Sequence, residues 1–215
     1  MLTAVQQSTM RQVGGSDMAG LKYGLASDYE TIRNDKHIKS CSYRIIVGQL
    51  VNEALGDLNT EVSYAQDANA KSAFCEPGHG RMPVQENEAA VSSLILEKLG
   101  VTKKLGQTFS LQIETDGQVQ EKEFVLCGYW EGDQTAMAQQ CFVSRAYQME
   151  VAPDQTKAYD KNQPDEIAGY YMIDFNFFHS FDIRKKTLAM LAENGYDLET
   201  VQYGINWAYT FHTVD

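Results

Sequence analysis

The sequence predicts an α+β fold, with helix-and-strand units at the two chain ends and a strand-rich region between them. A β-branched and aromatic run at 38–51 follows a short helix pattern, and an alternating hairpin pattern occupies 109–130. A strand, helix, strand pattern fills 169–203 at the other end. With 215 residues, 43% of them hydrophobic, the chain is long enough to bury a core without disulfides or metals.

The N-terminal region is predicted to form two helices and a long strand. The polar stretch before the glycines at 14–15 contains no proline, which favours a helix that ends at these glycines. Ser27 and Glu30 have the spacing of a capping box and predict a helix over 28–34. The run at 38–51 has the composition of a strand.

The middle of the chain contains one clear helix pattern. Gly100 is typical of a helix end, and the residues before it recur at helical spacing. We therefore expect an amphipathic helix over 91–100, with an apolar face formed by Val91, Leu94, Ile95 and Leu99.

A hairpin is the strongest local pattern. The segment 109–114 alternates apolar and polar residues, as a strand with one buried face does. Asp116 and Gly117 form a turn that is typical of hairpins and lead to a second strand at 123–130. This hairpin must cover an apolar face, and the helix over 91–100 is the expected partner.

The C-terminal region begins after a polar stretch without periodicity, which we interpret as a surface loop and a boundary. Ser180 or Asp182 is the expected cap of a helix that buries Ile183, Thr187, Met190 and Leu191. The predicted elements are a loop at 154–166, a strand at 169–178, this helix ending at Gly195, and a strand at 200–203.

The charge and hydropathy patterns exclude several function classes. A net charge of -11 repels phosphate backbones, and the scattered Lys and Arg residues form no basic stripe, so we expect no nucleic-acid partner. No stretch reaches the roughly 18 apolar residues of a membrane helix, and the first residues do not form a signal peptide. Taken literally, this predicts a cytoplasmic protein. If the segment is excised from a longer protein, its targeting information lies outside it.

The four cysteines, Cys41, Cys75, Cys127 and Cys141, show neither a CxxC pair nor zinc-site spacing with histidines. They are either buried free thiols or include a disulfide, for which three pairings are open. Cys75 and His79 have the spacing of a nucleophile and a base on a helix. Pro77 and Gly78 favour instead a turn with a buried thiol and an exposed imidazole.

The acidic pairs predict no firm metal or catalytic site. Glu86 with Glu88, and Glu131 with Asp133, could act as acid and base or bind a divalent cation, but a solvated polar face is the better explanation in so acidic a chain. Neither pair fits a calcium-loop motif, and no phosphate-cradling loop is present. We therefore expect no catalytic residues, no cofactor and no metal.

The aromatic-rich segments around Trp130, Trp207 and Tyr209 are candidates for contact with a peptide or another subunit. The alternative is that these residues belong to the core and to strand ends, because Trp and Tyr often bury their rings there.

Five segments carry a recognisable combination of motifs. In 80–100 (GRMPVQENEAAVSSLILEKLG), a Gly-Arg-x-Pro turn precedes an Asn-Glu strand and a Leu-rich helix that ends in Leu-Gly. The other segments are 104–111 (KLGQTFSL), 124–133 (FVLCGYWEGD), 143–147 (VSRAY) and 206–209 (NWAY). Together they resemble the extracytoplasmic, MacB-like periplasmic core domain of FtsX-like ABC transporter permeases from Gram-positive gut-type bacteria.

The resemblance implies a two-part fold and a mechanical, non-enzymatic role. A membrane-proximal, porter-like α/β subdomain is implied for 1–51 and 151–215, with a sabre-like mixed β/α lobe inserted at 52–150. Such a domain sits at the extracellular face of the cell membrane and couples ATP-driven motion of membrane helices to substrate handling, in export or in peptide or antibiotic sensing. The implied partners are the rest of the permease, its cytoplasmic ATP-binding subunit, a second permease copy, and a peptide or lipoprotein substrate. A stand-alone secreted peptide-binding or adhesion domain is the alternative.

Overall fold

The computed structural model describes residues 4–163 and 169–212 and divides the chain into two compact units. One, which we call the terminal unit, consists of Met1–Arg44 and Asp154–Asp215. The other, the lobe, is the continuous segment Ile45–Pro153. The first division falls inside the long strand β2 (Ile38–Leu50), so this strand contributes to both units. The sequence-based boundary at 51/52 lay at the end of this strand, where the strand pattern ends.

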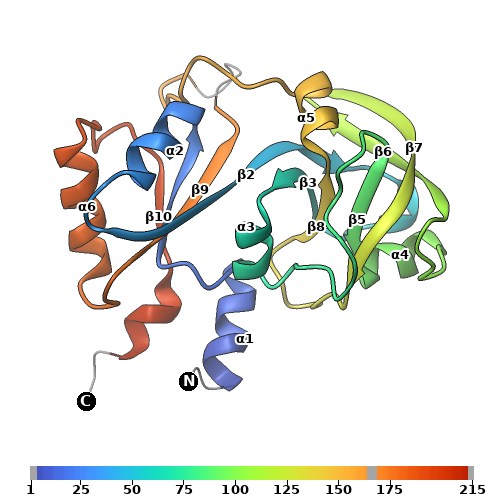
Figure 1. Ribbon diagram of the computed structural model, residues 1–215, viewed down its shortest axis with the longest axis horizontal. Helices are drawn as coiled ribbons and strands as arrows, with labels where there is room; N and C mark the ends of the chain where they lie inside the picture. Colours follow the sequence, from blue (N-terminus) through green and yellow to red (C-terminus); the bar gives the residue numbers. More distant parts are fainter. Residues whose placement is uncertain (1–3, 164–168, 213–215) are drawn as a thin grey trace. The chain divides into compact units, whose positions relative to one another are not determined.

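The terminal unit contains four neighbouring strands in the order β10-β1-β9-β2 (Figure 1). Strand β1 pairs antiparallel with both β9 and β10, which come from the other end of the chain. Its elements are α1 (Ala4–Gln12), β1 (Ala19–Gly24), α2 (Ala26–Arg33), β9 (Tyr171–Phe177), α6 (Ile183–Glu193), β10 (Tyr203–Ile205) and the 3-10 helix η2 (Trp207–His212).

Period-two and helical burial patterns explain two of these elements. Every second residue of β9 is buried, because alternate side chains of a strand point to one face. Helix α6 buries Ile183, Thr187, Met190 and Leu191, which confirms the predicted inward face. Asp182 is its N-cap residue, as one of the two expected positions, but its side chain makes no capping hydrogen bond.

Two local predictions in the terminal unit are wrong. Helix α2 begins at Ala26, and its N-cap is Leu25 rather than Ser27. The Asp28 carboxylate accepts the Leu25 backbone N–H at 2.7 Å, and this bond fixes the start of the helix two residues earlier than the Ser27 and Glu30 spacing suggests. The last strand spans Tyr203–Ile205, because these residues form the register with β1. Of the predicted loop at 154–166, the last three residues lie outside the described residues.

The lobe contains a mixed set of strands in the order β2-β3-β8-β5-β7-β4. Strand β6 pairs antiparallel with both β7 and β2, whereas the pairs β3 with β8 and β5 with β7 are parallel. Its elements after β2 are η1 (Glu53–Leu55), β3 (Thr60–Ala65), α3 (Asp67–Ser72), β4 (His79–Gly80), β5 (Glu88–Ser92), α4 (Ser93–Leu99), β6 (Thr108–Thr115), β7 (Gln118–Trp130), β8 (Gln139–Val143) and α5 (Arg145–Val151).

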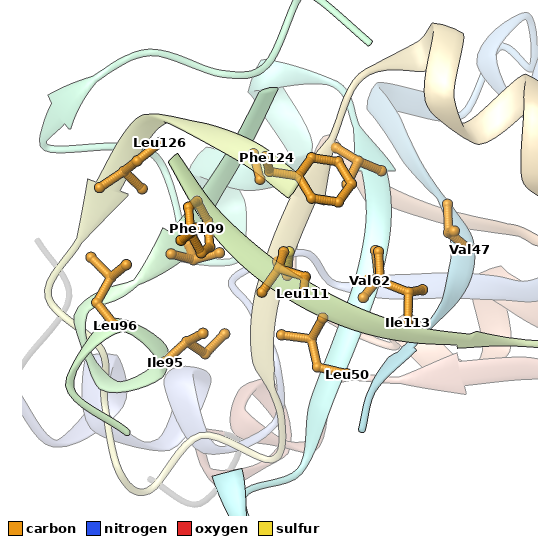
Figure 2. Close-up of a cluster of buried hydrophobic side chains, with 14 of the residues drawn as sticks. Val47, Leu50, Val62, Ile95, Leu96, Phe109, Leu111, Ile113, Phe124 and Leu126 are labelled. Carbon is orange, nitrogen blue, oxygen red and sulfur yellow. The ribbon is translucent and has the colours of Figure 1, made fainter. Parts of the chain in front are cut away.

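A cluster of buried apolar side chains forms the core of the lobe (Figure 2). The inward residues of the hairpin β6-β7 contribute to it, as the alternation predicted, and helix α4 adds Ile95 and Leu96. Asp116 and Gly117 both have positive φ, which confirms the two-residue hairpin turn. The labelled members are Val47, Leu50, Val62, Ile95, Leu96, Phe109, Leu111, Ile113, Phe124 and Leu126.

The predicted helix over 91–100 begins too early. Val91 lies in strand β5, which pairs with β7 on one side and β8 on the other, and α4 starts only at Ser93. A strand buried on both faces has a continuous apolar sequence, and Val91 therefore also fits the helical spacing. The predicted end is confirmed, because Gly100 is left-handed with φ 67°. These findings together confirm the α+β class.

Candidate interaction surfaces

The structure gives Cys75 and His79 different surroundings. The half-buried Cys75 thiol donates to the Ala73 carbonyl at 3.4 Å. The exposed His79 ring lies on the short strand β4 and stacks on Tyr129, with ring centroids 4.6 Å apart. A turn with a half-buried thiol and a stacked imidazole describes this segment better than a nucleophile and its base.

All four cysteines are free thiols in the structure. Burial is the main cause that raises the pKa of Cys41 to about 12 and that of Cys127 to about 11. Burial also raises the pKa of Cys141, which is completely enclosed in the lobe core. Because the thiolate is the reactive form, these three thiols are poor nucleophiles at neutral pH.

The acidic pairs are engaged in ion pairs and hydrogen bonds. Glu88 forms a two-pronged ion pair with Arg81, and Glu86 pairs with Lys122 at 2.7 Å. Glu131 accepts a hydrogen bond from the Ser93 hydroxyl at 3.0 Å and forms an ion pair with Lys103. The Asp133 carboxylate accepts the Thr135 backbone N–H two residues along the chain. Within residues 4–163 and 169–212, no three potential metal ligands come together.

The three candidate aromatic residues differ in exposure. Trp130 is only 6% exposed and packs on Phe142, with ring centroids 5.3 Å apart. This burial removes Trp130 from the candidate contact surface. Trp207 is 45% exposed and Tyr209 is half-buried, and both lie in η2 of the terminal unit.

Tyr209 takes part in a hydrogen-bonded joint between the two chain ends, which we call the terminal junction and define as residues 15–18 and 206–209. The Tyr209 hydroxyl donates to the Ser16 carbonyl at 2.6 Å. The Asn206 side-chain amide donates to the carbonyls of Gly15 at 2.9 Å and Asp17 at 2.8 Å. Burial and the nearby Asp17 raise the pKa of Tyr209, so its hydroxyl stays a donor at neutral pH.

Backbone groups strengthen the terminal junction. The Asn206 backbone N–H donates to the Met18 carbonyl at 3.0 Å, while the Asn206 side-chain oxygen accepts the Ala208 N–H at 3.0 Å. On the α1 side, the Gly15 N–H donates to the Met10 carbonyl at 2.8 Å. The last turn of α1 is thus bonded to the segment that Asn206 holds.

Asn176 extends the terminal junction into the strands. Its side-chain oxygen accepts the Met18 N–H at 3.1 Å. Its amide nitrogen donates to the Asp17 carboxylate at 2.5 Å and to the Ser40 hydroxyl at 3.1 Å. Because Asn176 lies on β9 and Ser40 on β2, the segment after α1 is fixed to two strands as well as to η2.

The sequence signalled only part of the terminal junction. Tyr209 and the segment 206–209 were singled out, but Asn176 was not, because it is one polar residue in an alternating strand. An asparagine directly before a helical segment is a common cap, and this was the available signal for Asn206.

This arrangement of strands and helices is the fold of extracytoplasmic domains of bacterial ABC-type transporters. The periplasmic region of MacB from Actinobacillus actinomycetemcomitans is similar, with a TM-score of 0.55 and 10% identity, covering 96% of each chain. The extracellular domain of the noncanonic ABC-type transporter YknZ from Gram-positive bacteria has a TM-score of 0.51 and 10% identity, covering 88% of this chain and 98% of that one. At such identities the likeness establishes the fold. No protein-family model and no curated protein matches the sequence. Among the described residues, none of the helices has the length and hydrophobicity needed to cross a membrane.

Proposed function

We propose that this chain is the extracytoplasmic domain of an ABC transporter permease. It acts mechanically: the terminal unit is the membrane-proximal part and passes the ATP-driven motion of membrane helices to the lobe, which handles the substrate in export or in sensing. The fold supports the class of protein, and the terminal junction is the observation that carries the mechanical role.

Helix α1 and the 3-10 helix η2 lie at the same end of the terminal unit (Figure 1). Helix α1 and η2 contact each other there, and the terminal junction bonds the segment between α1 and β1 to η2. A segment held by several short hydrogen bonds moves with its partners, because each broken bond to a half-buried group costs about 1–3 kcal/mol. A displacement of α1 is therefore transmitted to β1 and β9, because the segment between α1 and β1 is held by these hydrogen bonds and does not move independently.

The proposed partners are the remaining permease, its cytoplasmic ATP-binding subunit and a second permease copy. The exposed Trp207 of the terminal junction is our candidate contact with the membrane-embedded part, because amphipathic Trp rings favour the edge of a membrane or of an apolar interface. No catalytic step is proposed, since the candidate dyad and the acidic pairs have structural partners.

The first experiment tests the location. Val119→Cys places a thiol on the exposed β7 end of the hairpin turn, and a membrane-impermeant maleimide is added to intact cells that express the full gene. We expect labelling without lysis. The parent protein, in which Cys127 and Cys141 are buried and Cys41 and Cys75 are half-buried, is the control for background labelling. Labelling only after lysis overturns the proposal, and release of the labelled chain into the medium favours the secreted alternative.

The second experiment tests the coupling in the reconstituted transporter. The Asn206→Ala, Tyr209→Phe double variant removes the side-chain bonds of the terminal junction. We expect ATP hydrolysis to continue while ATP-dependent changes in amide hydrogen exchange within the lobe are lost. Thr135→Ala, which removes only a local bond to Asp133, is the matched control. Unchanged exchange responses in the double variant contradict the mechanical role of the junction.

A further inference from the structure

The terminal unit contains a pocket that plays no part in the proposed coupling. Its volume is about 270 Å³, slightly below the roughly 300–1,000 Å³ found for small-molecule sites. The end of β9, one side of α6 and the residues before β2 form its walls. The residues used below are Lys36, His37, Phe177, Phe178, Lys186 and Met190.

The pocket is apolar inside. Phe177 and Met190 are buried and line it. Phe178 at its rim is 60% exposed, and the neighbouring Phe181 is 57% exposed. Exposed phenylalanines beside an apolar pocket favour an apolar ligand, because a bound chain covers both the lining and the rings.

Among the described residues, two ammonium groups at the pocket have no carboxylate partner. Lys186 Nζ lies 3.6 Å from the centre of the Phe181 ring and donates to the His179 carbonyl at 3.1 Å. In the described part of the chain, neither Lys186 nor Lys36 forms an ion pair. Both differ in this from Lys103 and Lys122, which pair with glutamates.

Two acidic groups face the same region. Glu193 lines the pocket from the end of α6. The Asp35 carboxylate contacts His37, with its Oδ1 3.0 Å from the His37 Nδ1. Its other oxygen accepts a hydrogen bond from the Asn194 side-chain amide at 2.7 Å. Burial by itself raises the pKa of Asp35, but its hydrogen bonds with His37 and Asn194 outweigh this and lower the pKa below its usual value, so this carboxylate is ionised at neutral pH. Glu193 and the ionised Asp35 therefore both offset the positive charge of the two lysines.

We propose that this pocket binds a small amphiphilic carboxylate, with its apolar chain against Phe177 and Met190 and its carboxylate at the ammonium groups of Lys186 and Lys36. The site adds a ligand-binding role to the terminal unit and does not depend on the transporter assignment. An apolar interior with a few charged groups at the rim is the usual design of a small-molecule site. The unpaired lysines select the sign of the ligand's charge.

Methyl NMR of the chain with 13C-methyl methionine tests the proposal with octanoate as the probe. The Met190→Leu variant identifies the Met190 signal, and the exposed Met137 of the lobe reports non-specific adsorption. We expect octanoate to shift the Met190 signal with saturation while Met137 stays unchanged. Octylammonium, with the same chain and the opposite charge, is expected to bind at least about tenfold more weakly, as loss of a charge-assisted bond predicts.

Two charge variants make the test specific. Lys186→Gln is expected to weaken octanoate binding about tenfold, and Glu193→Gln to strengthen it a few-fold. Ala189→Trp, at an exposed position on the pocket wall, is expected to block binding without unfolding the chain. Equal affinities for octanoate and octylammonium, equal shifts at Met137 and Met190, or full octanoate binding by the Ala189→Trp variant would each overturn the proposal.

Discussion

The lobe and the terminal unit both bury apolar side chains, but the terminal unit also joins two distant chain segments through polar side chains. The lobe is one continuous segment, and apolar side chains of its strands and helices form two core clusters. The terminal unit joins two segments that are far apart in the sequence, and polar side chains such as Asn176 and Asn206 bridge them. The hydrophobic effect is non-directional, whereas hydrogen bonds between given atoms require one relative position of the two segments that they join. The unit that we propose to transmit motion is thus the one with the specific ties.

The two tryptophans allow each unit to be followed separately. Trp130 lies in the lobe and Trp207 in the terminal unit. The variant Trp207→Phe therefore reports on the lobe, and Trp130→Phe on the terminal unit, by intrinsic fluorescence during urea unfolding. Each substitution below is compared with its own single-tryptophan parent.

The largest expected effect is that of Leu111→Ala in strand β6. Leu111 is completely buried in the core of the lobe, and removing such a side chain costs about 2–5 kcal/mol of unfolding free energy. We expect this loss in the Trp207→Phe background, which is the lobe reporter, and a smaller change in the Trp130→Phe background, which is the terminal reporter. Val119→Ala, at an exposed position on the same hairpin, is the control and should change stability by less than about 0.5 kcal/mol. Equal losses in both reporters would show that the units unfold as one.

The second prediction concerns Glu88, which forms hydrogen bonds with the segment before β5. Its carboxylate accepts two bonds from Arg81, at 2.8 and 2.5 Å, and the backbone N–H groups of Val84 and Gln85 at 2.8 and 2.9 Å. Hydrogen bonds from Arg81 are the main cause that lowers the pKa of Glu88 from 4.5 to about 2. Glu88→Gln is expected to cost about 1.5–3 kcal/mol in the lobe, the usual range for bonds to a charged group.

The pH dependence of this loss follows from the lowered pKa. A carboxylate with a depressed folded pKa stabilises the protein fully above its unfolded pKa, near 4.5, and loses that contribution as the pH falls toward 2. The stability difference between the parent and Glu88→Gln should therefore be constant from pH 7 to about pH 5. It should shrink below that range. A difference that grows on acidification argues against the ion pair as its source.

Asn206→Ala probes the polar ties of the terminal unit. The variant loses the bonds to the Gly15 and Asp17 carbonyls, which should lower the unfolding free energy by about 1–2 kcal/mol with the terminal reporter. The lobe reporter should not change. Asn34→Ala, which removes an exposed bond to a carbonyl four residues away, is the matched control. A similar loss of unfolding free energy in both variants would show that the long-range bonds of Asn206 stabilise the terminal unit no more than a local bond does.

The smallest expected effect is that of Gly100→Ala at the end of α4. Gly100 has φ 67° and open space where a Cβ would be, so the cost arises from the left-handed backbone alone, about 1 kcal/mol. Gly78→Ala, which also meets open space but has no positive φ, should be neutral. Equal effects of the two substitutions on the lobe reporter would show that backbone conformation is not the cause.

Local patterns predicted the hairpin and α6 well, because their signals lie within a few residues. Alternation and an Asp-Gly turn specify β6-β7, and helical spacing specifies the buried face of α6. The same reasoning misplaced the start of α4, since Val91 in a fully buried strand resembles a helix position. The patterns also did not predict the strands β3 and β8, which pair with each other in parallel and lie in segments without strict alternation.

The sequence by itself determined the class of fold, the hairpin, the ends of several helices and the absence of a recognisable catalytic motif. Only the tertiary structure decided that Trp130 is core, that Asn176 and Asn206 form the terminal junction, and that Lys186 lies beside an apolar pocket. The physical reason is the distance along the chain. Periodicity records which side of an element faces the core, whereas the partner of a polar side chain more than 150 residues away exists only once the strands have paired.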